Sequence, residues 1–482
     1  MVYGRYLDSR LNQNKVETFD AIIIGSGQAG NPLARKLSEE GKRVALVESA
    51  FIGGTCINYG CTPTKTLVAS AKNVAQARRA EEYGIKLSND VPNYGMVRQH
   101  KNKVVTGFRQ GLENSLLQDP NISIFHGKGT FSGYKKLRVQ IEDSDHKFIA
   151  SELIFINTGT RAGIPDIEGL SSVKFFTSKT ILELDYLPKH LLIVGGGYVA
   201  LEFSQIFRRM GSMVTIIEKS SRLLPKEDDD VGSAIAQVLE AEGVKIITDA
   251  KIRRLKADTN ESISAEVLSA GESFTLSCTH LLIATGRTPN TDDLDLSKTG
   301  VRVDKKGFIS VNDHLETTEA GIYALGDVKG GPAFTHVSYH DYIVVADHLF
   351  GKKDSSIRNR LIPYCLFIDP ELGRVGLTEK EAGKRGLDFS VAKMTTSFIA
   401  RAIETGETTG FVKAILDNNT KKILGVAVIC AGGGELMSLM QIAMLGGLRY
   451  DQLRDTMFAH PTYAEAINNL FSPMHLQGGV LS

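Results

Sequence analysis

A short apolar run leads into a glycine-rich turn in the stretch FDAIIIGSGQAG, residues 19–30. The apolar run, 19–24, predicts a buried parallel strand, and a helix is expected from the turn to about Glu40. A second strand is predicted at 44–47, and it ends at Glu48. The turn alone would also fit a tight turn that binds nothing. Followed by helix, strand and acid, it is the fingerprint of a dinucleotide-binding βαβ unit.

Each residue of this fingerprint has a physical task. Gly25 permits the tight turn, Gly27 lets the backbone approach a pyrophosphate, and Gly30 allows the helix to pack closely on the strand. Glu48 can accept hydrogen bonds from a ribose.

The fingerprint occurs a second time in LLIVGGGYVA, residues 191–200. Gly195 and Gly197 occupy the first two glycine positions, and Ala200 in the third is an accepted variant. The flanking elements are predicted as a strand at 191–194, a helix at 201–210 and a strand at 214–217, closed by Glu218. A ribose contact of Glu218 favours NADH, whereas Lys219 and Arg222 could instead hold the 2′-phosphate of NADPH.

Further turns repeat between the two halves of this region. A buried strand at 153–157 runs into Thr158-Gly159-Thr160, and a strand at 281–284 runs into Thr285-Gly286-Arg287, which suggests duplicated nucleotide folds. A strand near 321–325 ends in Gly326-Asp327, where a carboxylate can bind a ribityl hydroxyl; a plain turn at the end of a strand would look the same.

Two cysteines follow the first fold in GGTCINYGCTPTK, residues 53–65, ahead of a helix expected from about Thr64 to Arg79. Cys56 and Cys61 can close a small disulfide ring at the mouth of that helix, where the helix dipole favours a thiolate. Such an exposed, strained pair suits redox catalysis. Half of a zinc site and two buried thiols are the alternatives, but zinc would need two further ligands, and the remaining cysteines are scattered at 278, 365 and 430.

Composition limits the function classes. A chain of 482 residues with 42% hydrophobic and 23% charged residues has the size and balance of a globular enzyme of several domains. The net charge of +1 gives no reason to expect a nucleic-acid partner. No membrane span or signal sequence is evident, and residues 1–18 are interpreted as an extension of unknown purpose. Five cysteines in a chain of this length favour a reducing compartment. The cytoplasm is therefore the expected location.

The pattern changes from about residue 361. Strands are predicted at 364–368 and 374–377 around a turn at 369–373, and at 411–416 and 423–429 around a second turn. Helices are predicted at 435–445 and 462–470, so this region is expected to form a separate α+β domain. His336, His340 and His348 lack the carboxylate pattern of a metal site, and no metal is predicted.

Taken together, the two cysteines, the two dinucleotide folds, Gly326-Asp327 and the segment HPTYAE at 460–465 resemble the pyridine nucleotide–disulfide oxidoreductases over residues 19–471. This family includes dihydrolipoamide dehydrogenase, glutathione reductase and mercuric reductase. The resemblance implies an α/β protein with FAD in one Rossmann-like fold, NADH or NADPH in the other, and a C-terminal α+β dimerisation domain. The expected boundaries are 19–160 and 285–355 for the FAD-binding domain, 161–284 for the NAD(P)-binding domain and 356–482 for the dimerisation domain.

The resemblance also implies roles for individual residues. Cys56 resembles the thiol that meets the substrate, and Cys61 the thiol stacked on the flavin. Lys65 and Glu202 resemble an ion pair near the flavin. The residues expected to contact cofactors are Gly25, Gly27, Gly30, Glu48, Gly54, Thr55, Lys65, Thr158, Gly159, Gly195, Gly197, Tyr198, Glu202, Glu218, Gly286, Gly326 and Asp327.

His460, oriented by Glu465, resembles the acid–base that protonates the leaving thiol. Read without the family, His460 is a loop histidine before a helix. In the family it would serve Cys56 of the other subunit, which implies an obligate homodimer with a shared active site. Tyr198 resembles an aromatic gate that the nicotinamide displaces.

The expected activity is electron transfer from NAD(P)H through FAD and the cysteine pair to a disulfide or thiophilic acceptor. Soft-metal reduction and dihydrolipoamide dehydrogenase activity are alternatives within the family, and a flavin-binding redox sensor is a non-enzymatic one. The stretch at 471–482 has no cysteine pair like that of mercuric reductases, and Tyr59 and Thr62 differ from the small aliphatics usual in lipoamide and glutathione enzymes. The acceptor is left open.

Overall fold

The structure is a computed structural model that describes residues 16–87, 92–142, 145–258, 262–351 and 353–477. Over these residues the chain divides into two compact units. One unit combines the chain up to Pro63 with His100–Gly163 and Arg287–Arg360, and the other combines Thr64–Gln99, Ile164–Gly286 and the chain from Leu361 onward. Among the described residues no helix is both long and apolar enough to cross a membrane.

A parallel sheet forms the centre of the first unit. Its strands, in spatial order, are β19 (Ile322–Ala324), β8 (Leu153–Ile156), β2 (Ala21–Ile24), β3 (Val44–Glu48) and β4 (Ile122–His126). Every residue of β2 and β3 is buried, as the continuous apolar runs of a parallel sheet covered on both faces require.

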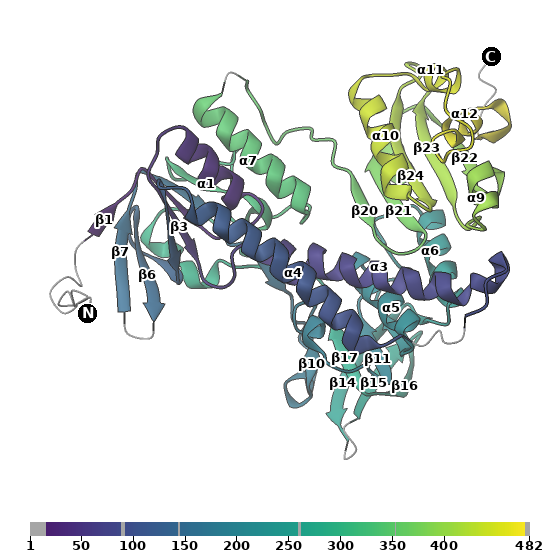
Figure 1. Ribbon diagram of the computed structural model, residues 1–482, viewed down its shortest axis with the longest axis horizontal. Helices are drawn as coiled ribbons and strands as arrows, with labels where there is room; N and C mark the ends of the chain where they lie inside the picture. Colours follow the sequence, from purple (N-terminus) through teal and green to yellow (C-terminus); the bar gives the residue numbers. More distant parts are fainter. Residues whose placement is uncertain (1–15, 88–91, 143–144, 259–261, 352, 478–482) are drawn as a thin grey trace. The chain divides into compact units, whose positions relative to one another are not determined.

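Different layers cover the two faces of this sheet. Ile23 packs on the side of helices α1 (Gly30–Glu39) and α7 (Thr335–Phe350), which lie side by side in Figure 1. Ile22 and Ile24 pack on the opposite side against a smaller sheet, with strands β1 (Val16–Thr18), β7 (Asp145–Ala150), β6 (Lys136–Glu142) and β5 (Lys128–Gly133). A two-stranded ladder joins β9 (Thr160–Ala162) to β18 (Arg287–Pro289), and the helices that follow β3 in sequence are α2 (Gly54–Tyr59), α3 (Cys61–Arg78) and α4 (Tyr94–Leu117).

The second unit repeats this arrangement. Its parallel sheet has the order β10 (Phe175–Phe176), β17 (His280–Ile283), β11 (His190–Val194), β12 (Met213–Ile217) and β13 (Lys245–Ile247). Leu191 and Ile193 pack on the side of α5 (Tyr198–Met210) and α6 (Asp229–Ala241). Leu192 and Val194 face an antiparallel sheet of β14 (Ala250–Ala257), β15 (Ile263–Ser269) and β16 (Glu272–Cys278). The two nucleotide folds are therefore structural duplicates.

An antiparallel sheet makes up the remainder of the second unit. Its order is β20 (Tyr364–Leu366), β21 (Glu371–Gly376), β24 (Ile423–Cys430), β23 (Phe411–Asp417), β22 (Phe389–Thr395) and β25 (Leu476–Gln477). Its helices are α8 (Glu379–Lys384), α9 (Ala400–Glu404), α10 (Gly433–Leu445), α11 (Tyr450–Arg454) and α12 (Ala466–Leu470). The buried side of α10 packs on β21 and β24.

The differences from the sequence predictions lie at element ends. Helix α3 begins at Cys61 instead of Thr64, because Pro63 falls in the first turn, where a missing N–H costs no intrahelical bond. Helix α12 begins at Ala466, since the Thr462 hydroxyl bonds Ala459 O and the Glu465 amide in a turn. The predicted turn at 369–373 is wrong in its second half, because β21 pairs with β24 from Glu371 onward.

The predicted N-terminal extension is only partly described. Residues 1–15 lie outside the described residues, whereas Val16–Thr18 form β1, which pairs in parallel with β7.

Candidate active site

The first glycine turn is bound to the acid at the end of β3. Glu48 Oε2 accepts hydrogen bonds from the Ser26 amide at 2.9 Å and from the Ser26 hydroxyl at 2.7 Å, and Oε1 accepts from the Ala50 amide at 2.8 Å. A carboxylate has about four acceptor positions, so the buried Glu48 keeps capacity for a further donor such as a ribose hydroxyl.

The second glycine turn has the same geometry. Glu218 Oε2 accepts from the Gly196 amide at 2.5 Å, and Oε1 accepts from the Ser220 amide at 2.8 Å. Gly25 and Gly195, which open the two turns, have φ angles of 102° and 114°. A Cβ atom at either position would lie 2.3 Å or 2.4 Å from a backbone oxygen, that of Asn157 or Ala284, so neither turn can carry a side chain there.

The cysteine stretch packs directly on the first glycine turn. Gly54 has φ +61°, and a Cβ atom there would lie 2.8 Å from Gly27 Cα. The Gly53 amide donates to the Ser26 hydroxyl at 3.1 Å, and the same hydroxyl donates to Glu48. One hydrogen-bond network thus holds both the nucleotide turn and the start of the cysteine segment, and both lie in the first unit of the fold.

Cys56 and Cys61 are in the dithiol form, on successive helices. Cys56 lies in α2, and Cys61 is the first residue of α3. The Thr335 hydroxyl, at the start of α7, donates to Cys56 Sγ at 3.1 Å and lies 3.3 Å from Cys61 Sγ. The structure therefore brings the two predicted thiols together around a threonine hydroxyl.

The Cys56 thiol resists ionisation in this structure. Its side-chain hydrogen bond with Cys61, together with burial, raises the pKa of the Cys56 thiol well above its usual range, and the Thr335 hydrogen bond opposes that shift. Of the other three cysteines, Cys278 and Cys430 are buried and Cys365 is partly buried. Burial raises the pKa of Cys278 and of Cys430 to about 12, and the pKa of Cys365 also rises, chiefly through burial. Cys56 and Cys61 differ from these three because their sulfur atoms lie together beside the Thr335 hydroxyl.

Asn58 fixes the backbone between the two cysteines. Its Nδ2 atom donates to Ile52 O and to Gly54 O, both at 3.0 Å. Its Oδ1 atom accepts from Arg109 Nε at 2.7 Å, and the Arg109 guanidinium stacks 3.6 Å from the centre of the Phe51 ring.

Lys65 and Glu202 form the predicted ion pair within the second unit. Lys65 Nζ lies 2.9 Å from Oε1 and 2.8 Å from Oε2 of Glu202. The Glu202 side chain is 3% exposed, and it also accepts from the Phe367 amide at 3.0 Å, whereas Lys65 is 31% exposed. Lys65 therefore compensates a buried charge while keeping access to solvent or a ligand.

Asp327 belongs to a polar cluster at the ends of β8 and β19. Its Oδ2 atom accepts from the Thr160 hydroxyl at 2.9 Å, and Arg287 Nε lies 3.6 Å away. Thr158 and Asn290 exchange two hydrogen bonds beside this cluster, at 2.9 and 2.8 Å.

Open space surrounds Gly159, which follows β8, and Gly286, which follows β17. A Cβ atom at Gly159 or Gly286 would meet nothing within 4 Å. A bound nucleotide requires backbone with open space beside it, so these two turns can accommodate a ligand. Thr55 is exposed and is also accessible to a ligand.

His460 and Glu465 interact as predicted. His460 Nδ1 lies 2.8 Å from Glu465 Oε2, and the imidazole is 66% exposed, which leaves Nε2 available to a substrate. Tyr198 is half-buried at the start of α5, next to the second glycine turn.

The two cations considered for a 2′-phosphate differ in their surroundings. Lys219 is exposed, whereas Arg222 Nη2 donates to the carbonyls of Pro225 and Glu227, and its guanidinium pairs with Asp229. Arg222 is therefore engaged by its own loop and by α6.

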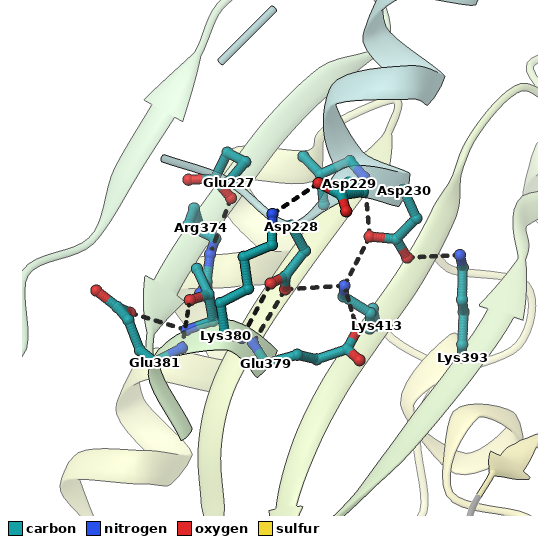
Figure 2. Close-up of polar contacts among 12 residues, drawn as sticks. Glu227, Asp228, Asp229, Asp230, Arg374, Glu379, Lys380, Glu381, Lys393 and Lys413 are labelled. Atoms are coloured by element: carbon teal, nitrogen blue, oxygen red, sulfur yellow. Dashed lines mark hydrogen bonds and ion pairs between the residues drawn. The ribbon is translucent and has the colours of Figure 1, made fainter. Parts of the chain in front are cut away.

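One trio of carboxylates in the described chain has metal-ligand spacing, namely Asp228, Asp230 and Glu379. Figure 2 shows that Lys413 Nζ lies among them, at 3.0, 2.8 and 2.7 Å. Lys413 is 1% exposed, so the protein's own ammonium group occupies the position of a cation. This network joins α6 to the antiparallel sheet.

Residues 19–341 match the model of the pyridine nucleotide–disulphide oxidoreductases, and residues 362–471 match that family's dimerisation domain. The chain belongs to this family. It is 39% identical over 458 residues to the probable pyridine nucleotide-disulfide oxidoreductase RclA of Escherichia coli K12, and this alignment covers 94% of the present chain and 99% of RclA. It is 30% identical over 460 residues to a mercuric reductase of Staphylococcus aureus (95% and 83% covered) and 32% identical over 459 residues to a dihydrolipoyl dehydrogenase of Bacillus subtilis (93% and 96% covered).

A solved structure shows the same fold. The Cu(II) complex of RclA from Escherichia coli, described as an HOCl-induced flavoprotein disulfide reductase, superposes with a TM-score of 0.87 at 38% identity, over 95% of this chain and 99% of that one. Family membership confirms the predicted α/β architecture, the oxidoreductase class and the cofactor classes, FAD and a pyridine nucleotide. The C-terminal region is a dimerisation domain of this family.

Sequence reasoning missed several residues of the site. Thr335 and Asn157 carry no motif of their own: Asn157 follows β8, and its side-chain Nδ2 atom lies 2.8 Å from the position of a Cβ on Gly27. The contact of Arg109 with Asn58 joins separate parts of the chain. No local pattern could have indicated these contacts, because each depends on how distant segments meet.

Proposed function

We propose that the protein transfers electrons from a pyridine nucleotide, NADH in preference to NADPH, through bound FAD and the Cys56–Cys61 pair to a disulfide or thiophilic acceptor. The observation that carries the proposal is the contact of the Thr335 hydroxyl with both sulfur atoms. A dithiol held in this way at the start of a helix suits reversible closure to a disulfide.

The first nucleotide fold offers the residues for FAD. The glycine turn with Glu48 would hold the adenosine diphosphate part, and Asp327 the ribityl chain, with Gly54, Thr55 and Gly159 nearby along the backbone. When bound, FAD accepts hydride from the pyridine nucleotide and supplies two electrons to the cysteine pair. Lys65, paired with Glu202, is the cation that the family resemblance assigns to the flavin.

The chain's own residues then perform the disulfide exchange. His460 takes the proton that Cys56 holds, and the Cys56 thiolate attacks one sulfur of an acceptor disulfide, which forms a mixed disulfide and releases a thiolate. Protonated His460 gives its proton to that thiolate. The Cys61 thiolate then attacks Cys56 Sγ, which restores the Cys56–Cys61 disulfide and releases the second acceptor sulfur as a thiolate, which takes its proton from water.

The preference for NADH rests on charge. Glu218 is fixed at the end of β12 by the Gly196 and Ser220 amides, where it can accept from a ribose hydroxyl and repel a 2′-phosphate. Arg222, a candidate for binding that phosphate, is already paired with Asp229.

A homodimer with the active site shared between subunits completes the proposal. Helix α10 exposes an apolar stripe of Leu439, Ile442 and Leu445, continued by Leu448, in the part of the chain that matches the dimerisation domain. Exposed apolar stripes of this kind are typical of subunit interfaces. His460, exposed in the same domain, would then serve Cys56 of the partner chain.

The boundaries 19–160 with 285–355, 161–284 and 356–482 are part of the proposal, and the family match over 19–341 and 362–471 supports them. The proposed compartment is the cytoplasm, where a reducing environment keeps a cycling dithiol from permanent oxidation.

A second candidate function is reduction of a soft metal ion by the same thiols. It is favoured by the mercuric reductases among the relatives and by the Cu(II) complex of RclA.

The test of the proposal is anaerobic reduction of the FAD-loaded protein with NADH and, separately, NADPH. A long-wavelength absorption band with NADH supports coupling of Cys61 to the flavin. Serine at Cys56 should then abolish turnover of disulfide acceptors while FAD stays bound. Bleaching without the band, or full activity of Cys56→Ser, contradicts the proposal. Turnover of Cu(II) or Hg(II) that requires added thiol would favour the second candidate.

A further inference from the structure

Asp341 is a buried carboxylate beside the segment Gly326–Asp327. Its Oδ2 atom accepts the Gly326 amide at 2.8 Å, and its Oδ1 atom accepts from Arg360 Nη1 at 2.6 Å. Lys329 Nζ lies 3.3 Å from Oδ2. The side chain of Asp341 is 0% exposed, and those of Arg360 and Lys329 are 9% and 8% exposed. A buried carboxylate persists only where cations and donors compensate it, and here both are present.

The backbone at Gly326 lies directly on helix α7. Gly326 has φ +72°, and a Cβ atom there would lie 3.1 Å from Ser338 Oγ and 3.4 Å from Asn157 Oδ1. Asp341, further along α7, accepts the amide of the same residue. The residue that precedes Asp327 is therefore anchored to α7 by contact and by a hydrogen bond.

The same helix begins at the redox pair. Thr335, the first residue of α7, donates to Cys56 and contacts Cys61. An α-helix is a rigid element, so a fixed distance along α7 separates the thiols from the anchor of Gly326. The same helix therefore contacts the two sulfur atoms and holds the backbone next to Asp327.

We propose that Asp341 is a positioning residue, which fixes Gly326 and Asp327 on α7 so that the ribityl contact and the thiol pair keep one geometry. This inference rests on the proposed function, because it takes Asp327 as part of the flavin site. Arg360 and Lys329 pair with the buried Asp341 carboxylate, and the hydrogen bond to the Gly326 amide does the positioning.

Two double variants separate the hydrogen bond from the charge. Asp341→Leu/Arg360→Met and Asp341→Asn/Arg360→Met remove the same carboxylate and the same guanidinium, but the asparagine carboxamide can still accept from the Gly326 amide. We expect the two proteins to melt at similar temperatures without FAD. The leucine variant should bind FAD about ten-fold more weakly and lose the long-wavelength band on reduction.

Equal FAD dissociation constants and equal bands in the two double variants would overturn the inference. Asp347→Asn is the matched control, because Asp347 lies on the same helix and bonds Ser355 instead of Gly326. This control should bind FAD as the wild type does.

A measurement on the wild type covers the case in which a double variant does not fold. Hydrogen exchange of the Gly326 amide should be slow in the FAD-loaded protein, and exchange as fast as in an exposed loop would contradict the anchor. A wild-type protein that binds no FAD would overturn the proposed function and this inference together. A wild type that binds FAD, with no difference between the double variants, would overturn the inference alone.

Discussion

The Thr335 hydroxyl donates a hydrogen bond to Cys56 Sγ over 3.1 Å, although 279 positions separate the two residues in sequence. This bond lowers the pKa of Cys56, against the raising effects of Cys61 and burial. Thr335→Val removes the bond with little change in shape, so the pKa of Cys56 should rise further. We expect acceptor turnover to fall by about ten-fold, since a hydrogen bond to a charged group contributes about 1.5–3 kcal/mol.

The pH profile of Cys56 alkylation in the reduced protein checks this prediction. It should shift to higher pH in Thr335→Val and stay in place in Thr335→Ser, which keeps the hydroxyl. An unchanged profile in the valine variant would show that the hydroxyl has no influence on the thiols.

Lys65 and Glu202 should respond unequally to substitution. Lys65→Met leaves the 3% exposed Glu202 carboxylate without its cation, which costs about 3–5 kcal/mol for a buried pair. Glu202→Gln leaves the 31% exposed Lys65 hydrated, and the amide oxygen can still accept from the Phe367 amide, so the loss should be about 1 kcal/mol. Urea unfolding of both variants measures the difference, and equal losses would contradict it.

The sequence predicted both nucleotide folds because each depends on local patterns. Apolar runs specify the buried strands β2 and β11, and the φ angles required at Gly25 and Gly195 exclude side chains there. The equivalence of Glu48 and Glu218 followed from their equal spacing from the two turns. Element ends such as the start of α12 were less predictable, because side-chain bonds like those of Thr462 decide them.

The contacts between distant segments could not be predicted from the sequence alone. Thr335 reaches the cysteines only because α7 packs beside α1, and Asp341 resembles many other helical acids until its burial is known. The Lys65–Glu202 pair was predicted from family resemblance, since nothing in their spacing implies a contact. Only their burial and their tertiary contacts distinguish these residues from neighbours of the same type, and neither can be read from a single sequence.

Glu218 should control coenzyme choice. Glu218→Gln removes the negative charge that a 2′-phosphate would meet, so the ratio of kcat/KM for NADH to that for NADPH should fall about ten-fold, equivalent to roughly 1.4 kcal/mol. Steady-state kinetics with both coenzymes give the ratio. Glu48→Gln, at the matching position of the first fold, should weaken FAD binding and leave the ratio unchanged; a wild-type preference for NADPH would count against the assignment.

Sharing of the active site can be tested by mixing two inactive proteins. In a dimer of Cys56→Ser with His460→Gln, a shared arrangement leaves one of the two sites with both native residues, so each mixed dimer should have about half of the wild-type activity. Random pairing makes about half of the dimers mixed, so the whole mixture should recover about a quarter. An arrangement within one chain gives no recovery.

The proposed interface can be tested separately. The double variant Ile442→Asp/Leu445→Asp should be monomeric in sedimentation velocity. The control Ile403→Asp, which changes an exposed residue of α9, should not be monomeric.

Lys413 should stabilise the junction of α6 with the antiparallel sheet. Lys413→Met leaves three carboxylates around an apolar side chain, and we expect a loss of about 3–5 kcal/mol in the free energy of unfolding at neutral pH. Lys380→Met is the control, because the Lys380–Asp229 pair is exposed and should contribute less than about 1 kcal/mol.

The effect of Lys413 should depend on pH in a defined direction. Burial opposes ionisation of Asp228 and Asp230, but their bonds to Lys413 and its neighbours hold both pKa values below the usual 3.8, so this stabilisation is present at neutral pH and disappears as pH falls through the lowered values. Burial likewise opposes the charge on Lys413, yet its carboxylate partners raise its pKa above 10.5, so the contribution persists up to that pH. Denaturant unfolding should therefore show a constant difference between wild type and Lys413→Met from about pH 6 to 9 and a smaller one below about pH 4. A difference that grows in acid would mean that the carboxylates are not held ionised by Lys413.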